Sequence, residues 1–235
     1  MPRKSRTIAV GYPHHVTQRG NDRRVVFIEE EDYTQYQRWL SRYARKYGLD
    51  IWAYCLMPNH VHAVVVPQTR EALAQTFNLV HMQYAQYIND KTRSTGHVWQ
   101  GRYFSCVLDE RHLYAAIRYV EMNPVRGKLA VSAEAYPWSS AGSHISGQPD
   151  PVLSGHCHLT DTVKDWGRYL AEEADPTAKD DLIKATAGGR PCGGKDFLRQ
   201  METLLGRRFI ALPAGRPSGK KKAEASQELL TRLGK

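Results

Sequence analysis

YCLMPNHVHAVVV, residues 54–66, places two histidines at the start of a valine-rich run that is typical of a β-strand. Side chains two apart on a strand point to the same face of a sheet, so His60 and His62 can reach toward one point beyond the corner at residues 57–59. Two imidazoles that converge in this way can bind a metal ion. The pair alone is a weak indication, because most such pairs on strands have structural roles.

The pattern around this corner predicts a mixed α+β fold. Residues 49–57 alternate as a strand does, and residues 60–66 return as its hairpin partner. Farther out, apolar residues recur at helical spacing, and Gly48 and Pro124 supply two stop signals. This pattern predicts an antiparallel sheet of the split βαβ, ferredoxin-like type, flanked by helices. The expected order is a strand at 7–18, a helix at 30–47, strands at 49–57 and 60–66, a helix at 70–90, a strand at 97–109 and a helix at 109–123.

The composition changes after about residue 133. Residues 141–155 are rich in Gly, Ser and Pro and are expected to form a linker. Short helices are expected near 160–175, 178–187 and 195–206, followed by a basic tail that starts with GRPSGKKK. We therefore expect two parts, a first domain over residues 1–133 and a mostly helical extension over residues 134–235.

The charge balance favours a polyanionic partner. The 235 residues include 33 Lys and Arg against 24 Asp and Glu, a formal net charge of +9, which favours nucleic acid and argues against an acidic partner. The four cysteines are scattered without CxxC spacing, so they indicate neither a zinc ribbon nor a disulfide framework and fit the reducing cytoplasm. No window approaches the roughly 18 apolar residues of a membrane span, so no membrane association is expected.

The helix expected at 109–123 offers a candidate nucleophile. On a helical projection, Tyr119 falls on a flank of the apolar side, and Asn123 follows one turn later on the same surface. Tyr103 and Tyr114 are rivals, because a tyrosine beside a sheet often only packs. Asn123 could equally be a simple helix C-terminal residue.

The other histidines receive plainer interpretations. His112 shares the flank of the candidate tyrosine and is expected to be exposed. A second HxH pattern, HCH at 156–158, lies in a loop-like region without a matching tyrosine helix, so we interpret it as structural or exposed. One of His14 and His15, together with Arg19, could line a DNA groove.

Together these motifs resemble a known family. MPNHVHAVV resembles the HUH motif (histidine, hydrophobic, histidine), and RYVEMNPVRGKL resembles the tyrosine helix of the single-tyrosine transposases. The closer resemblance is to the REP-associated tyrosine transposases, since HHVTQRGNDRR, GHVWQGRYFSCVLDE, YPWSS and GRPCGGKDFLRQMETLLGRR occur in the order typical of that branch. The first 140 residues or so resemble the branch well and the rest more loosely.

The resemblance implies an HUH-type endonuclease and strand transferase that cleaves single-stranded DNA at hairpin-forming repetitive extragenic palindromes. It implies that His60, His62 and Asn123 hold a divalent metal and that Tyr119 is the nucleophile. Mg²⁺ or Mn²⁺ suits such a site, and attack by a tyrosine would leave a 5′-phosphotyrosine and a free 3′-OH. Candidate DNA contacts are Arg19, Arg23, Arg24, Arg102, Tyr103, Arg126 and Lys128.

Other functions stay open at this point. A hairpin-binding regulator of DNA or RNA would keep the fold and the basic surface without cleavage. A barrel hydrolase needs about 250 residues of repeated strand and helix, and a relaxase usually has its tyrosine before the HUH motif. A monomer and a homodimer that exchanges its tyrosine helices are both compatible with the sequence.

Overall fold

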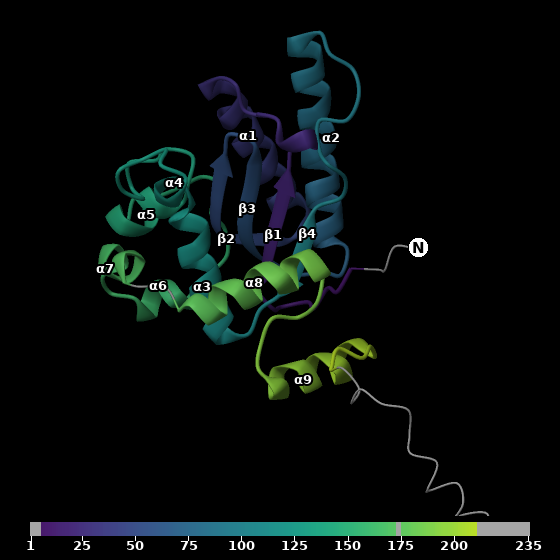
Figure 1. Cartoon of the computed structure of the whole chain (residues 1–235), viewed down its shortest axis with the longest axis vertical. Helices are drawn as coiled ribbons and strands as arrows, with labels where there is room; N and C mark the ends of the chain where they lie inside the picture. The colour runs from purple at the N-terminus through teal and green to yellow at the C-terminus, as the bar shows by residue number, and fades with distance from the viewer. Residues whose placement is uncertain (1–5, 173–174, 211–235) are drawn as a thin grey trace, which may run out of the picture.

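The computed structural model describes residues 6–172 and 175–210. Its centre is a four-stranded sheet with the strand order β2-β3-β1-β4, in which every neighbouring pair is antiparallel. Helices cover both faces of this sheet (Figure 1). The predicted α+β, ferredoxin-like architecture is thereby confirmed. The strands are β1 (His14–Arg19), β2 (Leu49–Met57), β3 (His60–Pro67) and β4 (Phe104–Val107).

One face is covered by α1 (Glu30–Tyr47) and α2 (Ala72–Thr92). The first helix begins at a capping box, in which Asp32 accepts from the backbone N–H of Glu29 at 2.9 Å, and ends at Gly48 with φ +67°. Alternate β3 residues Val61, Ala63 and Val65 belong to the core beneath the two helices. The intervening residues of β3 therefore point to the opposite face.

That opposite face is covered by α3 (Glu110–Glu121) and α8 (Pro176–Gly188), which also pack against each other. Leu113, Ile117 and Leu182 from these helices share a buried cluster with Val64 of β3. The alternation of β3 thus directs His60 and His62 toward the tyrosine helix. The remaining elements are η1 (Asn21–Arg23), α4 (Asn123–Arg126), α5 (Ala141–Ser146), α6 (His158–Thr162), α7 (Trp166–Ala171) and α9 (Lys195–Leu205).

Several expected elements are shorter in the structure. The strand expected at 7–18 begins only at His14, because Gly11 has φ +77° and Tyr12 N–H closes a turn onto Ala9 O at 3.3 Å. The strand expected at 97–109 is reduced to β4. The helix expected at 160–175 is two short helices, α6 and α7.

The linker prediction for residues 141–155 is wrong. Ser140 N–H donates to Tyr54 O at 3.0 Å, Ser154 N–H donates to Ile51 O at 3.0 Å, and Val152 is buried in the core. This segment therefore runs along the outer strand β2 and covers it. Small and polar residues suit this role because their backbone and hydroxyl groups supply the hydrogen bonds. The division at 133/134 stays a prediction.

Two further expectations concern other parts of the chain. The basic tail that starts with GRPSGKKK lies outside the described residues. In the described ranges, every helix is too short or too polar to cross a membrane.

Candidate active site

The two histidines of the HxH motif lie on one face of β3, beside the β2–β3 corner. The loop after β1 fixes this corner, since Gly20 N–H donates to Asn59 O and Val26 N–H donates to Pro58 O, both at 2.8 Å. The ring centroids of His60 and His62 are 4.9 Å apart, and the ring planes are nearly perpendicular at 84°. The expected pairing of the two imidazoles is therefore present.

Hydrogen bonds select the tautomer of each imidazole. The Thr186 hydroxyl donates its proton to Leu182 O at 2.7 Å, so its oxygen accepts from Nδ1 of His15 at 2.8 Å. His15 Nε2 is then an acceptor, and it takes a hydrogen bond from Nδ1 of His62 at 3.0 Å. His60 Nδ1 donates to Asn59 Oδ1 at 2.6 Å. Both histidines of the motif are thus left with a lone pair on Nε2.

Burial keeps these imidazoles neutral. It lowers the pKa of His60 to about 4, aided by the positive charge of Arg19. Burial also holds the pKa of His62 well below its usual value, with further contributions from His15, His60 and nearby arginines. A neutral imidazole with a free ring nitrogen is the form that binds a metal ion.

The donor set fits a divalent ion. Nε2 of His60 and of His62 makes no hydrogen bond within the described residues, while each Nδ1 is held by a second group, as is usual for metal-ligating histidines. No cluster of three or more His, Cys, Asp or Glu side chains suited to a metal occurs in residues 6–172 and 175–210. A third ligand from this part of the chain would therefore be of another type.

The third helix brings Tyr119 to this pair. Its ring stands edge-on to His62, with centroids 5.4 Å apart and planes at 88°, and edge-on to His15 at 6.0 Å. The guanidinium of Arg126 lies 4.5 Å from the centre of the Tyr119 ring and donates to Tyr119 O. Tyr119 and the histidines of its own chain therefore form one cluster.

The rival tyrosines lie elsewhere. Tyr114 packs edge-on against Tyr169, with ring centroids 6.1 Å apart. Tyr103 is only 4% exposed and carries the guanidinium of Arg6 at 3.7 Å from its ring centre. Of the three candidate tyrosines, Tyr119 is the one beside the HxH motif.

Contrary to what the sequence suggested, Asn123 does not continue the helix that carries Tyr119. The third helix ends at Glu121, Met122 has a non-helical ψ of 2°, and Asn123 is the first residue of α4. Its Nδ2 atom is buried without a hydrogen-bond partner in the described part of the chain. The residues around the pocket of His62 and Tyr119 do not include it, so its role as a ligand stays a prediction.

The predicted DNA contacts lie on several elements. Arg19, at the end of β1, lines the pocket of about 230 Å³ that contains His62 and Tyr119. Arg23 lies against the hairpin corner, where its carbonyl accepts from Asn59 Nδ2 at 3.1 Å. The predicted set divides into a buried tyrosine, Tyr103, and six exposed cations: Arg19, Arg23, Arg24, Arg102, Arg126 and Lys128.

Two expectations about other histidines can be checked. The exposed position expected for His112 is wrong: the side chain is 4% exposed, and its Nδ1 bonds Asp109, the residue that caps α3, at 2.6 Å. The second HxH behaves as interpreted, with His156 exposed and paired with Asp161 at 2.9 Å.

Sequence reasoning missed part of the site. His15 was proposed only as one of two groove-lining histidines, whereas it is buried and bonded directly to His62. Thr186 and Ile183 come from α8, more than a hundred residues after the HxH motif along the chain. No local motif marks these two, because only tertiary packing brings them to the pocket.

Comparison with known proteins gives a match to a family model and matches to solved structures. Residues 10–123 match the family model described as transposase IS200-like. The structure of a REP-associated tyrosine transposase bound to a REP hairpin matches with a TM-score of 0.54 and 16% identity, covering 66% of this chain and 93% of that chain. A Deinococcus radiodurans protein assigned to the transposases gives a TM-score of 0.37 at 16% identity, covering 55% of this chain and 98% of that one, too distant to support an inference. The search of curated proteins found no match.

The solved structure at 16% identity supports the fold alone. The family model, in contrast, spans the HxH strand and the tyrosine helix. Residues 10–123 are therefore similar to the IS200-like transposases across both elements that carry the site.

Proposed function

We propose that the protein is a metal-dependent, single-stranded DNA endonuclease and strand transferase that uses Tyr119 as its nucleophile. The observation that carries the proposal is the edge-on contact between Tyr119 and His62, at 5.4 Å between ring centroids. The match of residues 10–123 to the IS200-like transposase model supports a transposase-like function. The chemistry of the site supports the finer assignment.

Each side chain of the site would have its own role in cleavage. Tyr119 would attack the scissile phosphate through its hydroxyl oxygen, leaving a 5′-phosphotyrosine and a free 3′-OH, so that the bond energy is conserved for rejoining. Arg126, stacked on the Tyr119 ring, and Arg19, at the mouth of the pocket, would orient the phosphate by charge. His15 would hold His62 in the tautomer that exposes Nε2.

His60 and His62 would hold the divalent ion, Mg²⁺ or Mn²⁺, with Asn123 as a further proposed ligand. When bound, the ion would polarise the scissile phosphate as a Lewis acid. Asn123 would bind the ion through Oδ1, because the amide nitrogen Nδ2 can only donate hydrogen bonds.

The proposed substrate is a single-stranded DNA hairpin of the repetitive extragenic palindrome type. The described surface around the site is rich in arginine, and the matched transposase structure contains a REP hairpin. A cytoplasmic location, and a homodimer as one of two open assembly states, belong to the same proposal.

The test is an incubation of labelled hairpin DNA with the protein in Mg²⁺, Mn²⁺ or EDTA, followed by denaturing electrophoresis. We expect a metal-dependent protein–DNA adduct that disappears in Tyr119→Phe and in His60→Ala. Tyr114→Phe is the matched control, because Tyr114 lies on the same helix but packs against Tyr169. Hairpin binding without any adduct would instead favour a non-catalytic DNA- or RNA-binding regulator.

A further inference from the structure

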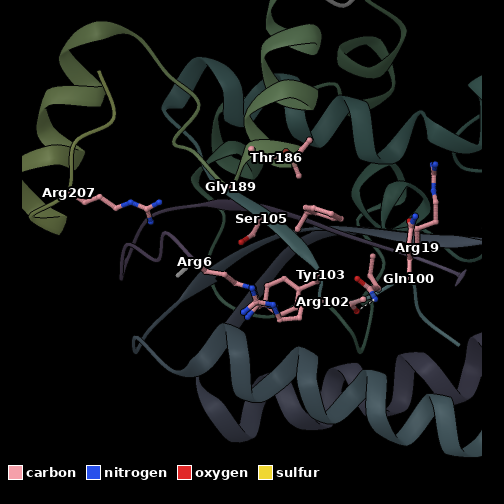
Figure 2. Close-up of a pocket in the computed structure, with 14 residues that line it drawn as sticks. Arg6, Arg19, Gln100, Arg102, Tyr103, Ser105, Thr186, Gly189 and Arg207 are labelled. Carbon is pink, nitrogen blue, oxygen red and sulfur yellow. Dashed lines mark hydrogen bonds between the residues drawn. The ribbon is translucent and has the colours of Figure 1, made fainter. Parts of the chain in front are cut away.

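A second cavity, of about 470 Å³, lies beside the edge strand β4. Figure 2 shows Arg6 and Tyr103 on one side of it and Thr186 and Gly189 on the other. It adjoins the pocket of Tyr119 and His62, because five residues line both. These shared residues are Arg19, Gln100, Phe104, Thr186 and Ala187.

Three polar atoms at this cavity lack a partner in the described part of the chain. They are Nη2 of Arg6, the hydroxyl of Tyr103 and Oγ of Ser105, all buried. Tyr103 and Ser105 are only 4% and 2% exposed. Folded proteins leave few buried polar groups unpaired, because such a group has lost its hydrogen bonds to water without a replacement. Three such groups around one cavity indicate a partner that residues 6–172 and 175–210 do not supply.

The chemistry of the three groups defines that partner. The guanidinium of Arg6 can only donate hydrogen bonds. Burial raises the pKa of Tyr103 to about 12, so its hydroxyl keeps its proton and donates, and a serine hydroxyl can donate as well. Four arginines and no carboxylate line the described cavity. An anion with several acceptor oxygens, such as a phosphate, matches this set.

An aromatic surface lies at the rim. Phe104 is 50% exposed although it is a large apolar residue in a strand, and it lines both pockets. Exposed aromatic rings beside basic grooves are where unpaired bases stack. Phe104 points to the face of β4 opposite to Tyr103 and Ser105. Because β4 is an edge strand and the cavity is lined by side chains from both of its faces, one nucleotide can place its phosphate on one side of the edge and its base on the other.

We infer that this cavity binds one unpaired nucleotide, with its phosphate held by Arg6, Tyr103 and Ser105 and its base stacked on Phe104. The inference deepens the proposed function, because the nucleotide would belong to the single strand that passes Tyr119. A free nucleoside monophosphate has the same chemistry, so the experiment must separate these two sources.

The test uses full-length protein carrying Tyr119→Phe, which prevents cleavage, and fluorescence anisotropy with hairpins that have unpaired extensions. We expect Arg6→Gln and Phe104→Ala to weaken binding about tenfold. The loss with Phe104→Ala should vanish when one particular unpaired position is abasic. Arg38→Gln is the control, because Arg38 is an exposed arginine of α1 that pairs with Glu31; it should bind as the parent does.

Tyr103→Phe separates a binding role from a structural one. It removes only a hydroxyl without a partner, so the free protein should be as stable as the parent or more stable, while DNA binding weakens. Equal binding by Tyr103→Phe, Arg6→Gln and the parent would overturn the inference.

Calorimetry with deoxynucleoside monophosphates provides the second arm. Saturable binding that Arg6→Gln abolishes, with unchanged hairpin affinity, would assign the cavity to a free nucleotide. Formation of the protein–DNA adduct, which tests the proposed function, is measured separately on protein that retains Tyr119. If variants lose hairpin affinity but no adduct ever forms, the cleavage proposal fails and the nucleotide site stands. If an adduct forms and no cavity variant changes affinity, only the nucleotide site fails.

Discussion

Nε2 of His15 lies 3.0 Å from Nδ1 of His62, so a buried histidine of β1 stands directly behind the HxH motif of β3. Thr186 of α8 continues this contact, with its hydroxyl 2.8 Å from the other nitrogen of His15. Helix α8 is thereby connected to the proposed metal ligand His62 through two side chains, Thr186 and His15.

Removing the Thr186 hydroxyl should weaken metal binding. Thr186→Val takes away the acceptor that orients His15, and the loss of such a supporting group typically reduces metal affinity about 10- to 100-fold. Titration with Mn²⁺, followed by electron paramagnetic resonance, measures this directly. Thr203→Val is the control, because Thr203 also donates to the carbonyl four residues earlier, at 3.1 Å, but lies exposed on α9. Equal Mn²⁺ affinity in both variants would remove Thr186 from the site.

Stability should fall in mild acid. Burial lowers the pKa of His14 and His60 to about 4 and of His15 and His81 to about 3, below the usual 6.5. The unfolded chain therefore binds protons that the folded chain refuses, so the free energy of unfolding is fully retained above about pH 6.5 and decreases as the pH falls toward 4. Urea unfolding at pH 8, 7, 6 and 5 tests this. A free energy that stays constant or rises below pH 6 would contradict it.

Glu121 should be important for the position of the tyrosine helix. Its buried carboxylate accepts from Ser140 at 2.5 Å, from His144 at 2.6 Å and from Trp166 at 2.7 Å. Glu121→Ala leaves these donors unpaired, and we expect it to cost about 3–5 kcal/mol. The control is Glu172→Ala, which removes a surface ion pair with Arg118 and should cost at most about 1 kcal/mol. Chemical denaturation measures the free energy of unfolding of both variants. A similar small loss of that free energy in each would contradict the proposed role of Glu121.

Arg126 should affect cleavage more than its neighbour Lys128. Arg126 is stacked on Tyr119, while Lys128 is exposed in the loop after α4. Arg126→Ala should reduce the rate of adduct formation at least about tenfold through the loss of phosphate orientation. Lys128→Ala should change binding only modestly and mainly at low salt. The measurement is the single-turnover rate of adduct formation by each variant on one hairpin. Equal rates for Arg126→Ala and Lys128→Ala would remove Arg126 from the catalytic cluster.

The sequence was informative where the signals are local. The HxH strand, its hairpin corner and the helix at 30–47 follow from alternation, from Pro58 and from Gly48, and each is present as expected. The flank position of Tyr119 also follows from helical periodicity. These features need no knowledge of distant contacts.

The rest of the site depends on packing between distant segments. Thr186 reaches His15 only because α8 lies across β1 and β4, and no spacing in the chain encodes that contact. The cover on β2 was mistaken for a linker because its composition resembles that of loops, although Ser140 and Ser154 bond to the strand. Asn123 was expected to continue the tyrosine helix, but the break at Met122 moved it to a new one.

The central claim is that Tyr119, placed beside His60 and His62, forms the covalent bond to DNA. The most direct measurement is mass spectrometry of the protein after reaction with a hairpin oligonucleotide in Mg²⁺ and digestion of both partners. The account predicts a nucleotide phosphate on the peptide that contains Tyr119, and none when EDTA is present. A modified peptide containing Tyr103 or Tyr114 instead, or no modified peptide with any divalent metal, would contradict it.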